Sequence, residues 1–197
     1  MDYATMKKTT RKNIMDAVWL LYQKKAINKI TVREITETAN CSRGAFYAHF
    51  KDVYDVLEAI EIDLIKDLLF SNVSAFLNTM LSGEYKQLNQ SEYAERFMEN
   101  FDDEKTNKIR VLLVEKKDSG FETLFRDYVT EVYTPFIKNL PIDDIMGEYI
   151  LQQIIENILT SWRFRESKAK MLPVGTLYKC SIRCLTENMI DLLYEEK

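Results

Sequence analysis

The chain has 197 residues, 46% of them hydrophobic, with 5 Gly, 3 Pro and a formal net charge of −4. A chain of this length can bury a substantial core, and so few turn-forming residues argue against a β-sandwich or barrel. The stretches between them are rich in good helix formers, so we predict an all-α fold. No apolar run reaches the roughly 20 residues of a membrane span. The basic N-terminus lacks a signal-peptide pattern, which predicts a cytoplasmic protein without a membrane segment.

Charge is distributed unevenly along the sequence. Residues 1–51 hold 10 Lys and Arg against 4 Asp and Glu, whereas residues 52–197 hold 17 against 27. A basic first quarter followed by an acidic remainder is typical of a protein that meets a polyanion with its N-terminal part. The alternative is a chance excess of positive charge.

The first predicted helix covers Thr10 to Ala26. Its apolar residues recur at steps of three and four and form one buried stripe: Ile14, Ala17, Val18, Leu21 and Tyr22. A basic cluster lies at its N-terminal end: Lys7, Lys8, Arg11 and Lys12. Positive charge there opposes the helix dipole, so the cluster is either a phosphate contact or a solvated basic start.

Two short helices follow. Thr31 and Glu34 have the spacing of a capping box, which predicts a helix from Thr31 to about Thr38 or Ala39. Asn40 tolerates the left-handed backbone conformation and therefore marks a turn. Ser42 can then cap a third helix that runs to about Phe50.

The third helix combines small residues with aromatic ones. Phe46 and Phe50 are expected to pack inward, which leaves Arg43, Ala45, Tyr47 and His49 more exposed. Gly44 costs a short helix roughly 1 kcal/mol relative to Ala, which indicates that something approaches its backbone closely. Two short helices joined by a tight turn form a helix-turn-helix, whose second helix enters the major groove of DNA. The alternative is a plain helical hairpin with a structural histidine.

The segment ITVREITETANCSRGAFYAHFKDVYDVLEAI resembles the N-terminal DNA-binding domain of the TetR family of bacterial transcriptional regulators. The matching positions are Thr31, Ile35, Ala39, Ser42, Gly44, Phe46, Tyr47, His49, Phe50 and Leu57. Asn40 and Cys41 replace the usual glycine and valine of the turn, and Val53-Tyr54 replaces the common acidic and lysine positions. The missing lysine removes one expected phosphate contact, for which Lys51 can compensate.

This resemblance implies a set of DNA-binding residues: Thr31, Arg33, Ser42, Arg43, Gly44, Ala45, Tyr47, His49 and Lys51. Thr31, Tyr47, His49 and Lys51 are expected at phosphates. Ser42 to Ala45 are expected at bases or at the DNA backbone, and Arg43 can reach a guanine edge or a phosphate. The partner implied is double-stranded DNA with a palindromic operator.

A long fourth helix, with Asp52 and Asp55 at its start, leads out of this head. Its apolar stripe is Val53, Val56, Leu57, Ile60, Leu64 and Leu68. We predict a DNA-binding domain at residues 1–52 and a larger helical body at residues 53–197. The body is expected to have helices near 71–82, 91–101, 104–117, 121–139, 143–165 and 174–194, with about nine helices in the fold.

No catalytic arrangement is recognised in the body. His49 is the only histidine and belongs to the head, which excludes a Ser-His-Asp or Cys-His unit elsewhere. Cys41, Cys180 and Cys184 include no C-x-x-C pair, and their spacing favours core positions over a metal site or disulfide. We therefore expect no enzyme activity, no cofactor and no metal.

The two C-terminal helices, near 143–165 and 174–194, carry apolar residues on more than one face. Such a helix must be covered from two sides, either by a second copy of the chain or by other helices of a monomer. Because the last two helices of TetR family members dimerise, the resemblance favours a homodimer through these helices.

The resemblance also implies a pocket for a small-molecule effector in the body. Candidate lining residues are Phe97, Phe101, Arg110, Tyr128, Tyr133, Gln153 and Glu156, a mixture that suits a ligand site and an ordinary helical core alike. The predicted function is a homodimeric repressor that a small molecule releases from its operator. The alternative is a DNA-bound adaptor whose body docks a protein partner.

Overall fold

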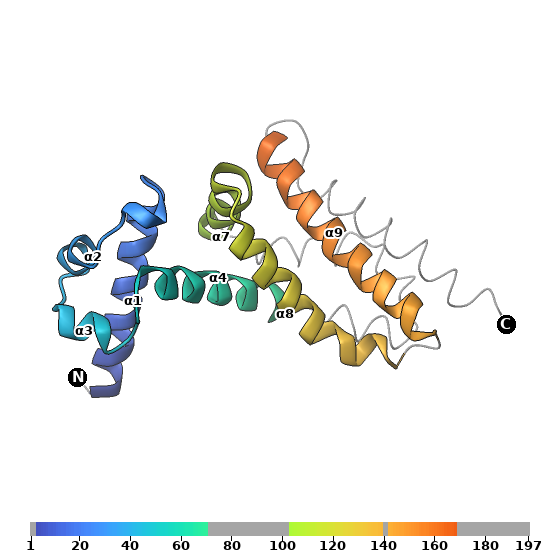
Figure 1. Ribbon diagram of the computed structural model, residues 1–197, viewed down its shortest axis with the longest axis horizontal. Coiled ribbons are helices and arrows are strands. Elements are labelled where there is room, and N and C mark those ends of the chain that lie inside the picture. The colour runs from blue at the N-terminus through green and yellow to red at the C-terminus, as the bar shows by residue number, and fades with distance from the viewer. Residues whose placement is uncertain (1–2, 71–102, 140–141, 169–197) are drawn as a thin grey trace. The chain divides into compact units, whose positions relative to one another are not determined.

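The computed structural model describes residues 3–70, 103–139 and 142–168 (Figure 1). The α-helices are α1 Tyr3–Tyr22, α2 Val32–Thr38, α3 Arg43–Tyr47, α4 Val53–Phe70, α7 Asp103–Arg110, α8 Ser119–Ile137 and α9 Asp144–Lys168. A 3-10 turn, Ile27–Lys29, follows α1, and a π-helix, Val111–Lys116, follows α7. No strand occurs among the described residues, and the predicted all-α fold is confirmed.

The number and length of the helices differ somewhat from the prediction. The described residues form seven α-helices, slightly fewer than the nine expected, while the helices predicted near 71–82, 91–101 and 174–194 lie outside the described residues. The first helix begins at Tyr3 instead of Thr10 and ends at Tyr22 instead of Ala26. The predicted helix near 104–117 is divided between α7 and the π-helix.

The chain packs as two compact units, Met1–Asp63 and Leu64–Lys197. The first unit contains α1, α2 and α3, which contact one another, together with the greater part of α4 (Figure 1). Its core is formed by the predicted apolar stripes: Ile14, Val18, Tyr22, Ile35, Phe46, Phe50, Val56, Leu57 and Ile60 are all buried. Burial of these side chains is the main source of free energy that holds such short helices in place.

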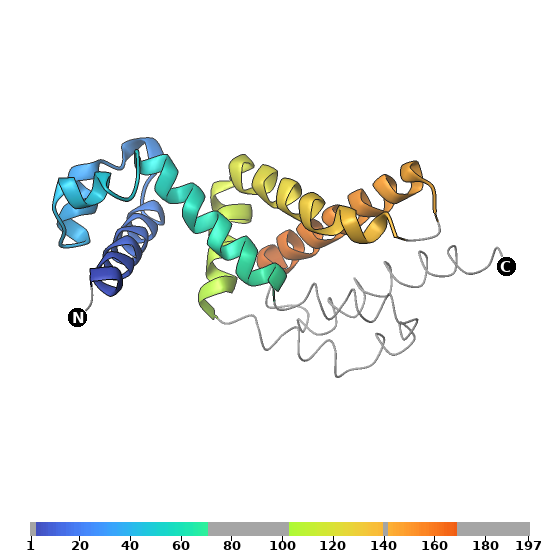
Figure 2. The same cartoon turned by 90° about the horizontal axis from the view of Figure 1, so that it is seen from below.

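The second unit is built around α8 and α9, which pack against each other (Figure 2). Phe125 of α8 meets Trp162 of α9 with ring centroids 5.1 Å apart in an edge-to-face arrangement. The π-helix packs on both α8 and α9, and its Val111, Leu112 and Leu113 are buried. The π-helix was not predicted from the sequence, whose pattern indicated one continuous helix near 104–117.

Candidate nucleic-acid interface

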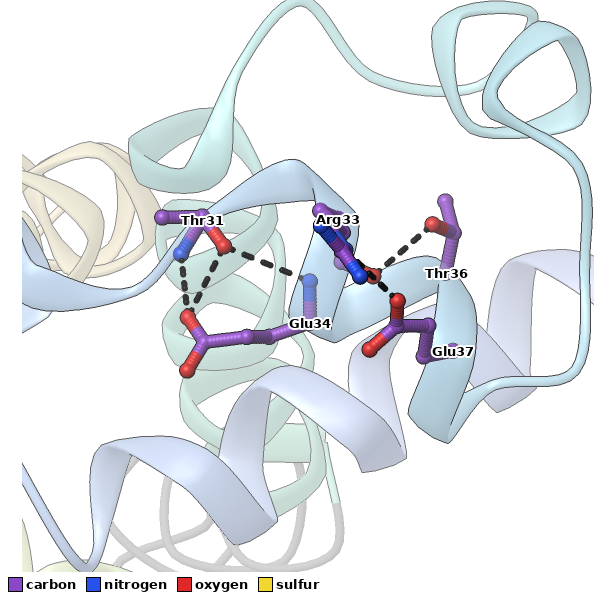
Figure 3. A network of polar contacts seen from close by, with 5 residues as sticks. All are labelled: Thr31, Arg33, Glu34, Thr36 and Glu37. Carbon is purple, nitrogen blue, oxygen red and sulfur yellow. Dashed lines mark hydrogen bonds and ion pairs between the residues drawn. The ribbon is translucent and has the colours of Figure 1, made fainter.

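The start of α2 is fixed by a capping box. The Thr31 hydroxyl accepts a hydrogen bond from the Glu34 amide at 3.3 Å, and the Glu34 carboxylate accepts one from the Thr31 amide at 3.0 Å (Figure 3). Lys25 adds an ion pair at 2.5 Å from its Nζ to Glu34 Oε1. These donors, Lys25 first, lower the pKa of Glu34 to about 2. The predicted capping box is confirmed, and it sets the position at which the chain enters α2.

The turn between α2 and α3 contains a left-handed residue. Asn40 has a φ of 48°, which Asn adopts more readily than most residues with a Cβ. The Cys41 amide then donates to the Thr36 carbonyl at 3.0 Å, which closes the end of α2. Asn40 therefore supports the sharp turn despite replacing the usual glycine.

Helix α3 is capped by Ser42, whose hydroxyl accepts a hydrogen bond from the Ala45 amide at 3.0 Å. The α-helical part ends at Tyr47, earlier than the predicted end near Phe50. The chain still turns tightly after it, because the His49 and Phe50 amides both donate to the Phe46 carbonyl. Phe46 and Phe50 are both buried and anchor the segment on the core of the first unit.

The two sides of α3 differ in exposure. Phe46 is fully buried, whereas the neighbouring Tyr47 is 60% exposed, with the two ring centroids 5.3 Å apart in an edge-to-face contact. Gly44 is exposed, and a Cβ added to it would meet no atom closer than Ser42 Oγ at 3.7 Å. Among the residues that the structure describes, none lies close enough to require glycine at this position.

His49, two residues after α3, is half-buried, with its ring centroid 6.3 Å from that of Phe50. Burial, and then the positive charges of Lys7 and Arg11, lower the pKa of His49. The lowered pKa favours the neutral imidazole, which can donate one hydrogen bond and accept another.

Arg11 is held by contacts within the protein. Its guanidinium lies 5.4 Å from the centroid of the Phe50 ring and forms an ion pair at 3.6 Å with Asp63 of α4. This side chain links α1 to the end of the α3 segment and to α4, all within the first unit. By sequence Arg11 belongs to the basic cluster at the start of α1, because no local pattern connects residues 11, 50 and 63.

The structure brings most of the predicted DNA-binding residues to the surface of the helix-turn-helix. Thr31, Arg33, Ser42, Arg43, Gly44, Tyr47 and Lys51 are exposed, while Ala45 and His49 are half-buried. The Lys51 amide donates to Asp55 at 2.7 Å and the Asp55 amide to Asp52 at 2.9 Å, which fixes the start of α4. The Lys51 side chain remains exposed beside this cap.

The candidate effector residues are placed differently from one another. Tyr133 is buried, and Tyr128 is half-buried with Lys66 Nζ 5.9 Å from its ring centroid. Arg110 is half-buried and bonds Asn107 at 2.5 Å. Gln153 and Glu156 are exposed on α9, and Glu156 forms an ion pair with Arg126 that lowers its pKa. Phe97 and Phe101 lie outside the described residues.

Two further observations concern only the described part of the chain. Its residues include no group of three His, Cys, Asp or Glu side chains that could hold a metal ion. None of its helices combines the length and apolar character needed to cross a membrane. Cys180 and Cys184 lie outside these residues.

Comparison with known proteins gives a family match for the N-terminal part of the chain and a similar fold. Residues 14–60 match the model of "Bacterial regulatory proteins, tetR family". None of the curated proteins matches the chain. Among solved structures, the "Dihydroxyacetone kinase operon activator DhaS" is similar with a TM-score of 0.57 and 19% identity, over 92% of this chain and 96% of that one. The two chains thus share a fold.

The matched residues 14–60 run from the buried Ile14 of α1 to the buried Ile60 of α4, and so contain the whole helix-turn-helix. The predicted resemblance is confirmed over these residues. Residues 14–60 thus match the tetR family of bacterial regulatory proteins, which supports a DNA-binding transcriptional regulator.

Proposed function

We propose that the protein is a homodimeric repressor that binds a palindromic operator and is released from it by a small molecule. The observation that carries the DNA-binding part is the exposed side of α3, where Arg43, Gly44 and Tyr47 face outward while Phe46 anchors the helix from behind. A helix whose outer side has no bulk at Gly44 can lie deep in the major groove. Residues 1–52 form the DNA-binding domain in this proposal.

Arg43 and Tyr47 have different roles in this complex. Arg43 begins α3, where its guanidinium can bond a guanine edge with two hydrogen bonds. Tyr47, His49, Thr31 and Lys51 bond phosphates, which position the domain on the duplex without reading its sequence. Ser42 and Ala45 lie against the DNA beside Gly44.

A homodimer is supported by the outer face of α9. Ile150, Ile154 and Leu159 of this helix are buried within the chain, whereas Ile145 is 82% exposed and Tyr149 is 59% exposed. Met146 and Phe164 are exposed as well. A second copy of the chain would cover this apolar face and provide the symmetry that a palindromic operator requires. The other predicted dimer helix, near 174–194, lies outside the described residues.

An effector would act by shifting a conformational equilibrium. It binds in the body, where Arg110, Tyr128 and Tyr133 are candidate contacts, and favours a state in which the two heads are wrongly spaced for the operator. Such a ligand can shift the equilibrium only by its different affinities for the two states. Effector and DNA must consequently weaken each other's binding by the same factor. Titrations in both orders test this equality.

The second candidate function is a DNA-bound adaptor, in which the body docks a protein partner instead of a small molecule. The exposed apolar face of α9 supports this role as well, since exposed patches of this kind mark sites of protein contact. The solved structure of similar fold is named an operon activator, so we keep activation as the alternative sign of regulation. In both proposals the protein acts in the cytoplasm and catalyses no reaction.

The deciding experiment is selection of random duplex DNA by the purified full chain, followed by sequencing of the retained molecules. A palindrome with half-sites about one helical turn or a multiple apart supports the dimeric reader. Arg43→Ala should then weaken operator binding by about 1–3 kcal/mol and relax the sequence preference at one position. Equal weakening on all sequences would instead make Arg43 a phosphate contact, and selection without any motif would overturn sequence-specific binding.

A further inference from the structure

An exposed arginine of the helix-turn-helix is bonded to a carboxylate one turn further along the same helix. Arg33 Nε lies 2.8 Å from Glu37 Oε1, and the two side chains are 74% and 62% exposed (Figure 3). The pair has the i,i+4 spacing that brings side chains together on a helix surface. Exposed ion pairs contribute little to the stability of a fold. The consequence of this pair therefore lies in the orientation that it gives to the Arg33 guanidinium.

The atom through which Arg33 bonds Glu37 decides which of its N–H donors remain available to a ligand. A guanidinium is planar and has five N–H donors in a fixed arrangement, one on Nε and four on the two Nη groups. Glu37 accepts from Nε, so the four donors on the Nη groups lie outside this bond at the exposed end of the side chain. Since the plane is rigid, holding Nε also restricts the direction in which the Nη donors point.

Helix α2 is the first helix of the motif, and in a helix-turn-helix complex the first helix crosses the DNA backbone while the second occupies the major groove. Arg33 lies in the first turn of α2. Two parallel Nη donors match two oxygens of a phosphate group. We propose that Glu37 is a positioning residue, whose carboxylate orients the Arg33 guanidinium so that its Nη groups bond a DNA phosphate. This inference rests on the proposed function and adds a residue that itself makes no DNA contact.

Two effects of Glu37 on DNA binding have opposite signs and can be separated by substitution. Its negative charge repels phosphates, so removing the charge alone should tighten binding or leave it unchanged. Its acceptor oxygen orients Arg33. Without that oxygen, the Arg33 side chain loses more rotamer freedom when DNA binds, so the affinity should fall by about 2- to 10-fold. Glu37→Gln removes the charge and keeps a carbonyl acceptor for Nε, whereas Glu37→Ala removes both.

The test compares the dissociation constants of the two full-length variants on an operator duplex from the selection and on a scrambled duplex of equal length. We expect Glu37→Ala to bind both duplexes about 2- to 10-fold more weakly than Glu37→Gln, because a phosphate contact is independent of sequence. In an Arg33→Ala background the two substitutions should bind equally. Arg33→Ala alone should reduce the slope of log affinity against log salt by about 1.

Several outcomes would overturn the inference. Equal affinities of Glu37→Ala and Glu37→Gln would do so, as would a difference that persists without Arg33. A loss confined to the operator would overturn the phosphate assignment. The scrambled duplex reports on phosphate contacts alone, so it tests the role of Glu37 even if the wild-type chain shows no sequence preference. The lack of a sequence preference would overturn the proposed sequence-specific function and not the role of Glu37. Circular dichroism melting of each variant verifies that the folds are equally stable.

Discussion

Arg110 and Glu115 form an ion pair although they stand five residues apart. In an α-helix, five residues turn by about 140° beyond a full turn, which would place the two side chains on nearly opposite faces. The segment that separates them is the π-helix Val111–Lys116, whose wider turn brings position i+5 back beneath position i. The ion pair is therefore specific to the π-helical geometry of this segment.

The first prediction concerns this pair. Both side chains are about two-fifths exposed, so Glu115→Ala should lower the free energy of unfolding by no more than about 1 kcal/mol. The local effect should be larger than the global one, because the pair links the two ends of the π-helix. Hydrogen exchange of the amides from Val111 to Lys117 should accelerate while that of α1 stays unchanged. Exchange that is unaltered in this segment would show that the buried Val111, Leu112 and Leu113 determine the π-helix alone.

The second prediction concerns Gly44 and separates stability from DNA binding. Alanine at this exposed helical position meets only Ser42 Oγ at 3.7 Å, so Gly44→Ala should stabilise the fold by up to about 1 kcal/mol. The added methyl group should nevertheless weaken operator binding, because α3 could no longer approach the DNA as closely. Urea unfolding and binding titration on the same sample measure the two effects. Unchanged affinity would mean that α3 does not enter the groove at Gly44.

The third prediction uses two adjacent aromatic residues as a matched pair. Phe46 is fully buried, so Phe46→Ala should cost about 3–5 kcal/mol, enough to unfold a domain of ordinary stability. Tyr47 is largely exposed, and Tyr47→Ala should change the melting temperature little while weakening DNA binding. If Tyr47→Ala instead unfolded the chain, the assignment of its outer side to DNA would be wrong.

The fourth prediction is a pH dependence that arises from Glu34. Its pKa in the folded protein is lowered to about 2, chiefly by the hydrogen bond from Lys25 and then by those from Thr31. A lowered pKa means that the folded state binds the proton less readily than the unfolded state. The stabilisation is thus fully present above about pH 5 and is lost as the pH falls through 4.5 toward 2.

Glu34→Gln isolates this charge, since glutamine can still accept from the Thr31 amide in a capping box. The wild-type chain should have a higher urea midpoint than Glu34→Gln above pH 5, and the difference should shrink as the solution is acidified. A difference that is independent of pH would contradict the assigned cause. Thr31→Ala removes the hydroxyl cap and should cost about 1 kcal/mol above pH 5. Its cost should also shrink on acidification, because the Thr31 hydroxyl donates to the Glu34 carboxylate.

The fifth prediction concerns the packing of α9 on the end of α8. A Cβ added at Gly147 would lie 2.7 Å from Ile137 Cγ2, well inside van der Waals contact. Gly147→Ala should therefore destabilise the chain by about 1–3 kcal/mol through overpacking. Combining it with Ile137→Ala, which removes the clashing methyl group, should cost less than the sum of the two single changes. Strict additivity in urea unfolding would show that the clash is relieved elsewhere.

Local chemistry made the helix-turn-helix predictable. The Thr31–Glu34 capping box, the left-handed Asn40 and the Ser42 cap each depend on residues within four positions of one another, and all three are present in the structure. The apolar stripes of α1 and α4 were equally readable, because burial of one helix face imposes a fixed period on the sequence. The existence of a DNA-binding head could therefore be predicted from the sequence.

Contacts between distant residues decided what the sequence did not determine. Arg11 belongs by position to a basic cluster, yet the fold places its guanidinium beside Phe50 and Asp63. We expected Gln153 and Glu156 to be polar residues of an interior pocket, but the rotation of α9 about its axis leaves both exposed. That rotation, like the π-helix that allows Arg110 to reach Glu115, depends on how α7, α8 and α9 pack together. Sequence alone determined the periodic apolar faces and the helix caps of this protein, since their causes are local. Tertiary packing determined which charged groups meet, because those partners come together only when the helices pack against one another.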